Sequence, residues 1–243
     1  MLAKYLNLVL FAGMVVMNYL ANALPLNNKT TGELSDMYPN LFVPAGITFS
    51  IWGVIYLLLL IYCIIQFTGS NQIAITGIAP WFGLTCVLNA LWIVAWHYQR
   101  LPLSLLIMIG LLVTLIYINI QIAGIRPGII KASFGIYLGW ICIATIANVT
   151  ALLVNYNWDG FGISEAIWTI IMISVGAIIV SLAIYSFRNP FIGLAVIWAF
   201  AGIIIKRQED YRSIVITAII AIIIVGIITA LGFFRKTATI PAP

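Results

Sequence analysis

The chain has 243 residues, of which 64% are hydrophobic and only 7% are charged, and its mean hydropathy is +1.16. A soluble domain is about 25% charged and roughly half apolar, so this composition excludes the soluble class. The net charge of +5 does not indicate nucleic-acid binding, because the eleven Lys and Arg residues are spread thinly between apolar runs. We therefore expect a multi-pass integral membrane protein, in the cell membrane, whose main partner is the lipid bilayer.

Apolar runs between charged and turn-forming residues predict an all-α bundle of about eight transmembrane helices. In chain order the predicted spans are 5–24, 41–67, 75–97, 101–122, 132–154, 163–185, 190–205 and 214–234. The first run resembles a signal peptide, but Asn18 and Asn22 lie one helical turn apart, so we expect a retained helix whose amides face the bundle. Residues 25–40 form the one sizeable loop, either a plain connector or a lid over a site.

Eight spans place both termini on the same side of the membrane. Six basic residues then lie on the side of the termini and five on the other side, which does not fix the orientation. The first group is Lys4, Arg126, Lys131, Arg188, Arg235 and Lys236, and the second is Lys29, Arg100, Lys206, Arg207 and Arg212. The second side also carries the acids.

Ionisable residues are absent from the middle of every predicted span, which argues against proton-coupled or ion-coupled transport. Cys63, Cys86 and Cys142 lie far apart in apolar runs and are interpreted as buried hydrophobic residues, with a metal site or a disulfide as the alternatives. The single histidine, His97, ends the third span and is interpreted as structural or interfacial, with axial haem ligation as the alternative. Because the sequence offers no catalytic triad, paired carboxylates or phosphate loop, we assign no catalytic residue and no metal site.

Tryptophans and asparagines recur at helical spacing on three predicted spans. The groups are Phe49, Trp52 and Tyr56; Asn89, Trp92 and Trp96; and Tyr137, Trp140, Ala144 and Asn148. An asparagine without a partner in hydrocarbon costs several kcal/mol, so Asn89 and Asn148 should face the bundle and bring their tryptophans with them. The groups are either packing aromatics with interhelical amide contacts or the walls of a cavity for a flat apolar ligand.

Residues 5–155 resemble the TspO/MBR family, the tryptophan-rich sensory proteins related to the translocator protein. Three segments carry the resemblance: Pro44-Ala45-Gly46 with Phe49, Trp52 and Tyr56; Leu88-Asn89-Ala90-Leu91-Trp92 with Arg100; and Tyr137-Leu138-Gly139-Trp140 with Ala144 and Asn148. The third is the most specific, because it matches Y-L-x-W-x-x-x-A-x-x-x-N of the fifth helix at five positions. The sequence departs from the family at Ile136, where a proline is usual, and in lacking the carboxylate often found in the fourth helix.

The resemblance implies a five-helix core over residues 1–157, to which residues 158–243 would add three transmembrane helices. It also implies a pocket, beneath the loop joining the first two helices, that binds porphyrins, haem-related tetrapyrroles or sterols as ligands, with no cofactor required. Homodimers are implied as well, although the additional helices put that pairing in doubt. The ligand-binding residues carried over by motif are Trp52, Tyr56, Asn89, Trp92, Tyr137, Trp140, Ala144 and Asn148.

The sequence therefore favours a non-enzymatic membrane receptor or sensor for a flat hydrophobic ligand, a tetrapyrrole or a sterol-like molecule. The alternative is a facilitative transporter of a small apolar or amphipathic solute, for which eight spans are more natural than five. Alternating access usually leaves an inverted repeat, and no such repeat is evident here.

Overall fold

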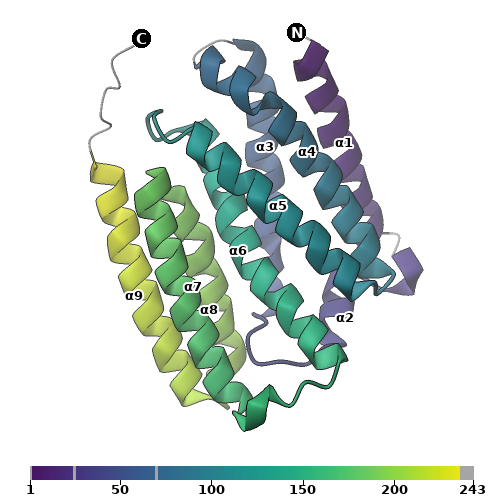
Figure 1. Ribbon diagram of the computed structural model, residues 1–243, viewed down its shortest axis with the longest axis vertical. Coiled ribbons are helices and arrows are strands. Elements are labelled where there is room, and N and C mark those ends of the chain that lie inside the picture. The colour runs from purple at the N-terminus through teal and green to yellow at the C-terminus, as the bar shows by residue number, and fades with distance from the viewer. Residues whose placement is uncertain (1, 24–25, 69–70, 236–243) are drawn as a thin grey trace.

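A computed structural model describes residues 2–23, 26–68 and 71–235, and these residues form a helical bundle without a β-strand (Figure 1). The helices are α1 (Leu2–Ala23), η1 (Leu26–Asn28), α2 (Thr31–Asp36), η2 (Gly46–Ser50), α3 (Ile51–Thr68), α4 (Gln72–His97), α5 (Leu101–Gln121), α6 (Ile129–Asn155), η3 (Gly160–Gly162), α7 (Glu165–Phe187), α8 (Phe191–Arg207) and α9 (Arg212–Phe234). The prediction of a polytopic all-α bundle is confirmed.

Seven helical segments of the described chain are long and apolar enough to cross a membrane: α1, the continuous run Gly46–Thr68, α4, α5, α6, α7 and α9. The seventh predicted span corresponds to α8, which has 17 residues and is therefore about 26 Å long. This length is slightly below the ~30 Å of a typical hydrocarbon core. Helix α8 packs against α6, α7 and α9, so neighbouring helices rather than lipid surround most of it.

The predicted second span begins too early, because residues 41–45 are not helical. Pro44 disfavours a helical conformation in the residue before it, and the amide of Ala45 bonds to the carbonyl of Gly202 rather than to a preceding turn. The predicted loop 25–40 contains the short helix α2, which begins at a capping box between Thr30 and Glu33. The predicted end of the first span at Leu24, and Pro25 after it, lie outside the described residues.

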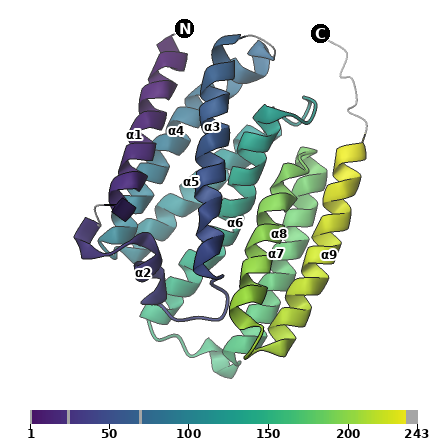
Figure 2. The same ribbon diagram turned by 180° about the vertical axis from the view of Figure 1, so that it is seen from behind.

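Helix α1 packs on α4, α4 on α5 and α5 on α6, and α3 covers α6 (Figures 1 and 2). Helix α8 lies against α6 and α9, so it joins the last three helices to the others. The start of α1 and the end of α9 lie at the same end of the bundle, as an even number of crossings requires (Figure 1). We call this the terminal end and the opposite one the loop end.

Close backbone contact and buried polar groups connect α8 to α6. A Cβ atom added to Gly139 would run into the carbonyl oxygen of Ile192, so only glycine allows this approach. At the terminal end, Asn189 donates to Asn119 Oδ1 at 2.7 Å and to the Lys131 carbonyl at 3.0 Å, and all three residues are buried. The predicted division at residue 157 falls in the connection between α6 and α7 and stays a prediction.

Candidate ligand-binding site

An aromatic cluster from three helices lies at the centre of the bundle, towards the loop end. Trp52 of α3 stacks on Tyr56 with ring centroids 5.6 Å apart and on Trp92 of α4 at 6.4 Å. It meets Trp140 of α6 edge to face at 6.3 Å, and Trp92 in turn stacks on Trp96 at 6.0 Å. The helical spacing in the sequence brings these rings together as expected, because each group occupies one face of its helix.

A small cavity lies between these rings and the loop that precedes α3. Its lining consists of Thr31, Ser35, Asn40, Val43, Pro44, Phe49, Trp52, Trp92, Trp96, Trp140, Ile143, Ala144, Ala147, Asn148 and Ala151. The volume is about 40 Å³, against roughly 300–1,000 Å³ for a site that holds a drug-sized ligand. The cavity in this conformation is thus too small for a ligand of that size.

Asn148 is the main hydrogen-bonding group of the wall. Its Oδ1 accepts the indole N–H of Trp92 at 3.3 Å and the hydroxyl of Ser104 at 3.1 Å, while its Nδ2 donates to the Ala144 carbonyl at 3.0 Å. Asn148 thus fixes the orientation of the Trp92 ring. Asn148 and Trp92 are 5% exposed, so the predicted inward orientation of this asparagine is confirmed.

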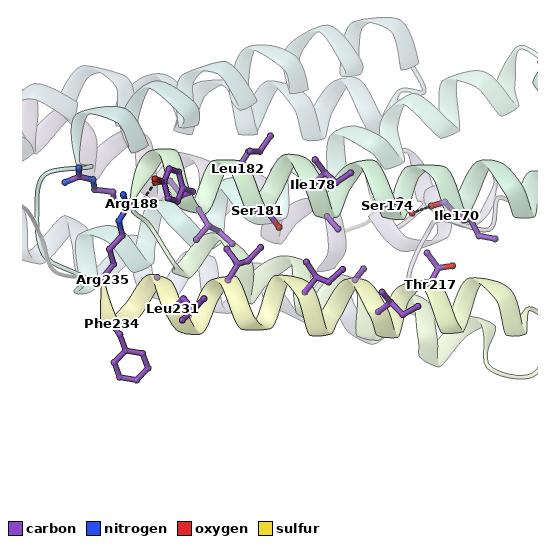
Figure 3. Close-up of a pocket in the computed structure, with 18 residues that line it drawn as sticks. Ile170, Ser174, Ile178, Ser181, Leu182, Arg188, Thr217, Leu231, Phe234 and Arg235 are labelled. Atoms are coloured by element: carbon purple, nitrogen blue, oxygen red, sulfur yellow. Dashed lines mark hydrogen bonds between the residues drawn. The ribbon is translucent and has the colours of Figure 1, made fainter.

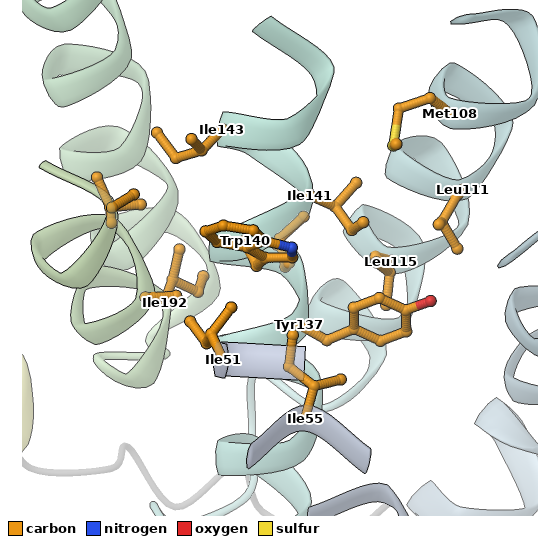
Figure 4. Packing of buried hydrophobic residues seen from close by; sticks show 14 of the residues in the cluster. Ile51, Ile55, Met108, Leu111, Leu115, Tyr137, Trp140, Ile141, Ile143 and Ile192 are labelled. Carbon is orange, nitrogen blue, oxygen red and sulfur yellow. The ribbon is translucent and has the colours of Figure 1, made fainter. Parts of the chain in front are cut away.

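Two other tryptophans of the lining have unused donors. The indole nitrogens of Trp96 and Trp140 are buried, and neither has a hydrogen-bond partner among the described residues. A buried donor without an acceptor costs about 1–3 kcal/mol, so we expect a water molecule or a ligand to accept a hydrogen bond from each of these two groups. Figure 4 shows Trp140 on α6, near Ile51 of α3 and Ile192 of α8.

Beneath the cavity, a chain of hydrogen bonds crosses three helices. The amide of Asn18 in α1 donates to Asn89 Oδ1 at 2.7 Å, and Asn89 donates to the hydroxyl of Tyr137 in α6 at 2.8 Å. Asn18 and Asn89 are buried, as predicted, whereas Asn22 is exposed and bonds only to the Asn18 carbonyl. This chain closes the floor of the site and holds α1 in the bundle.

Helix α2 covers the site from the loop end. The hydroxyl of Thr31 lies 3.1 Å from His97 Nε2, the amide of Asn27 donates to the His97 carbonyl at 3.2 Å, and Tyr38 contacts Trp96 with ring centroids 6.0 Å apart. Partial burial against this surface raises the pKa of Tyr38. His97 is fully buried at the end of α4 and helps to attach the cover, in agreement with the predicted structural role.

Residues 40–48, here called the mouth segment, are held from behind by α8. The Arg207 guanidinium donates to the carbonyls of Leu41 at 3.1 Å and Asn40 at 2.6 Å. At the other end of the segment, the indole of Trp198 donates to the Thr48 carbonyl at 2.8 Å. Since Asn40, Val43 and Pro44 line the cavity, α8 fixes part of the wall without touching the cavity itself.

The structure brings five of the eight predicted binding residues to the cavity: Trp52, Trp92, Trp140, Ala144 and Asn148. The other three, Tyr56, Asn89 and Tyr137, lie in the layer beneath it. Sequence reasoning missed Ile143, Ala147 and Ala151, which a continuation of the Trp140 face would have found. No pattern in the sequence indicates the loop residues Thr31, Ser35 and Asn40.

Within the described ranges, no group of three or more His, Cys, Asp or Glu side chains is placed to hold a metal ion. The described charges lie towards the ends of the bundle, and the only ion pair found among them joins Lys206 to Asp36 at 3.7 Å, at the loop end. The lining residues offer aromatic stacking and hydrogen bonding to a ligand.

Comparison with known proteins yields one family. The family model described as "TSPO-like protein" matches residues 4–231, which is nearly the whole chain. No curated protein and no solved structure matches the chain. The match continues beyond residue 155, where the quoted motifs end, through α7 and α8 and into α9. The chain thus belongs to the family of TSPO-like proteins, and it is an integral multi-pass membrane protein of that family.

Proposed function

We propose that this protein is a membrane receptor that binds a flat, amphipathic ligand of the tetrapyrrole class between its central tryptophans. The observation that carries the proposal is the pair of buried indole N–H donors without an acceptor, on Trp96 and Trp140, two tryptophans that line the same cavity. A ligand with an extended ring would use the aromatic walls, and its carboxylate or carbonyl oxygens would accept from these donors.

Binding of so large a ligand requires the aromatic cluster to open, since the present cavity is only about 40 Å³. Trp52 is the ring to be displaced, because it is only partly buried and lies at the start of α3, next to the mouth segment. Its contacts with other rings, each worth about 0.5–1.5 kcal/mol, would be replaced by contacts with the ligand ring. Affinity is then lower than for a preformed pocket by the cost of this exchange.

A direct test is titration of the purified protein with protoporphyrin and with haem, followed by tryptophan fluorescence. Trp140→Phe keeps a ring but removes one donor, so we expect affinity to fall about 3- to 10-fold, as for the loss of one hydrogen bond. Trp158→Phe is the matched control, because Trp158 lies in the connection between α6 and α7 and pairs with Trp168, outside the cavity.

Saturable quenching that is weakened by Trp140→Phe and not by Trp158→Phe would support the proposal. Quenching that rises linearly, or that is equal in both variants, would refute it. Reconstitution of the same protein in liposomes distinguishes a receptor from the alternative, a facilitative transporter. A receptor gives no flux of the ligand, whereas a transporter gives flux that Trp140→Phe reduces.

A further inference from the structure

A cavity much larger than the one at the tryptophans lies apart from that site, in a groove between α7 and α9. It has a volume of about 1,030 Å³ and an almost wholly apolar lining that includes Ile178, Leu182, Ile220, Ile224 and Leu231 (Figure 3). On α7 the lining runs from Ile170 to Arg188, about 27 Å along the axis. The groove is therefore nearly as long as the ~30 Å hydrocarbon core of a bilayer.

One polar atom inside this groove has no hydrogen-bond partner in the described part of the chain. The hydroxyl of Ser181 is buried and unpaired, whereas Ser174 and Thr217 bond to carbonyls of their own helices at 2.8 and 2.9 Å. Figure 3 shows the Ser181 side chain pointing from α7 towards α9. It lies about 10 Å along α7 from Arg188, and a rotation about its χ1 angle would bring the hydroxyl to an ester carbonyl at that depth.

Two arginines line the terminal end of the groove, Arg188 directly after α7 and Arg235 directly after α9 (Figure 3). The Arg235 guanidinium lies 4.2 Å from the centroid of the Tyr185 ring and donates to the Tyr185 carbonyl at 3.1 Å. Stacking and this hydrogen bond hold the guanidinium at the mouth of the groove and leave its other N–H groups for a ligand.

The charges around these arginines are of one sign. All six acids of the sequence are at the loop end: Glu33, Asp36, Asp159, Glu165, Glu209 and Asp210. The described charges at the terminal end are Lys4, Arg126, Lys131, Arg188 and Arg235; Lys236, predicted for this end, lies outside the described residues. No carboxylate of the described chain therefore neutralises the arginines of the groove.

We propose that the groove between α7 and α9 binds an anionic glycerophospholipid. Its phosphodiester would lie between Arg188 and Arg235, which suit phosphate oxygens, and its acyl chains would lie along the apolar walls, with Ser181 bonding an ester. Zwitterionic phosphatidylcholine carries the same phosphodiester, but its trimethylammonium group would add a positive charge beside the two guanidinium groups, which is unfavourable. A second copy of this chain in the groove would bring like charges together, which is unfavourable.

The test is native mass spectrometry of the purified full chain in detergent, titrated with dioleoylphosphatidylglycerol or dioleoylphosphatidylcholine. We expect the anionic lipid to bind at least about tenfold more tightly, and the double variant Arg188→Gln/Arg235→Gln to lose about ten- to thirtyfold of that affinity. The matched control is Arg126→Gln, an exposed arginine in the connection between α5 and α6, which should change affinity less than about twofold.

Ile224→Trp gives a second test that leaves every charge in place. Ile224 is 47% exposed and lines the groove, so an indole there should fill the space and weaken both lipids together. Equal affinity for the two lipids, or equal losses in Arg126→Gln and the double variant, would overturn the proposal. A concentration-dependent dimer that excludes lipid would overturn it as well. These outcomes are independent of tetrapyrrole binding at the tryptophan site.

Discussion

The contact between α8 and the mouth segment predicts two effects of Gly202→Ala. The substitution should destabilise the protein, and it should also lower the affinity of the tryptophan site for protoporphyrin. A Cβ atom at this position would lie directly on the Thr48 hydroxyl, 2.9 Å from Pro44 Cβ and 3.0 Å from Thr48 Cβ. The proline ring cannot rotate away, and Thr48 carries two branches, so the mouth segment or α8 must shift. Pro44 lines the cavity, and the shift therefore reaches the site proposed to bind the ligand.

The size of the effect follows from two opposing contributions. Overpacking in a close contact costs about 1–3 kcal/mol, while alanine gains at most about 1 kcal/mol over glycine in a helix. Gly226→Ala in α9 isolates the second contribution, because the nearest atom to its added Cβ, Ile197 Cδ1, is 4.0 Å away. We expect a net loss of about 1–2 kcal/mol in Gly202→Ala, and no loss or a small gain in Gly226→Ala.

Thermal unfolding in detergent measures the difference. For a chain of this size, 1 kcal/mol shifts Tm by about 2–4 °C, so Gly202→Ala should unfold about 2–8 °C below wild type. The same sample, titrated with protoporphyrin, should bind more weakly than Gly226→Ala. If Gly202→Ala is as stable as Gly226→Ala and binds ligand as well, then α8 does not determine the position of the mouth segment.

Two further predictions concern hydrogen bonds at opposite ends of the bundle. Asn189→Ala removes the partner of the buried Asn119 amide oxygen and should lower the free energy of unfolding by about 1–3 kcal/mol. The control is Asn22→Ala, at an exposed residue, which should lower it by less than about 0.5 kcal/mol. Thermal unfolding of both variants side by side checks this difference. Hydrogen bonds from the backbone and hydroxyl of Thr30 lower the pKa of Glu33, so the carboxylate stabilises the start of α2 above the ordinary Glu pKa, and this support is lost as the pH falls through the lowered value. The protection factors of the α2 amides, which correct for the intrinsic pH dependence of exchange, should therefore fall in that acidic range in wild type and stay constant in Glu33→Gln. The same fall in the variant would contradict this cause.

Much of the bundle could be predicted from hydropathy, because a membrane span is a local property of the sequence. Helices α4 to α7 and α9 begin and end within three residues of the predicted spans. The start of the second span could not be predicted in this way. Residues 41–45 are apolar, but their backbone pairs with α8, about 160 positions later in the chain.

The tryptophan face was predictable for a related reason. Trp92 stands at helical spacing from Asn89, and Trp140 stands at helical spacing from Asn148, and a polar amide in hydrocarbon can face only the bundle. The position of Asn89 beneath the cavity rather than in its wall follows from its bond to Tyr137, which periodicity does not encode. The collapsed volume of the cavity also depends on how whole helices approach one another, and no single segment specifies that distance.

Helix α8 contacts the mouth segment at both ends, through Arg207 and Trp198, and this arrangement has a thermodynamic consequence. If a ligand at the tryptophans displaces the mouth segment, the contacts of this segment with α8 must change as well. Helix α8 packs against α7 and α9, so the free energy of the displacement depends on those helices too. This coupling is reciprocal. An effector that stabilises the packing of α8 would change the affinity for the ligand by some factor, and the ligand would change the affinity for that effector by the same factor. The last three helices would then report occupancy of a site that they do not line.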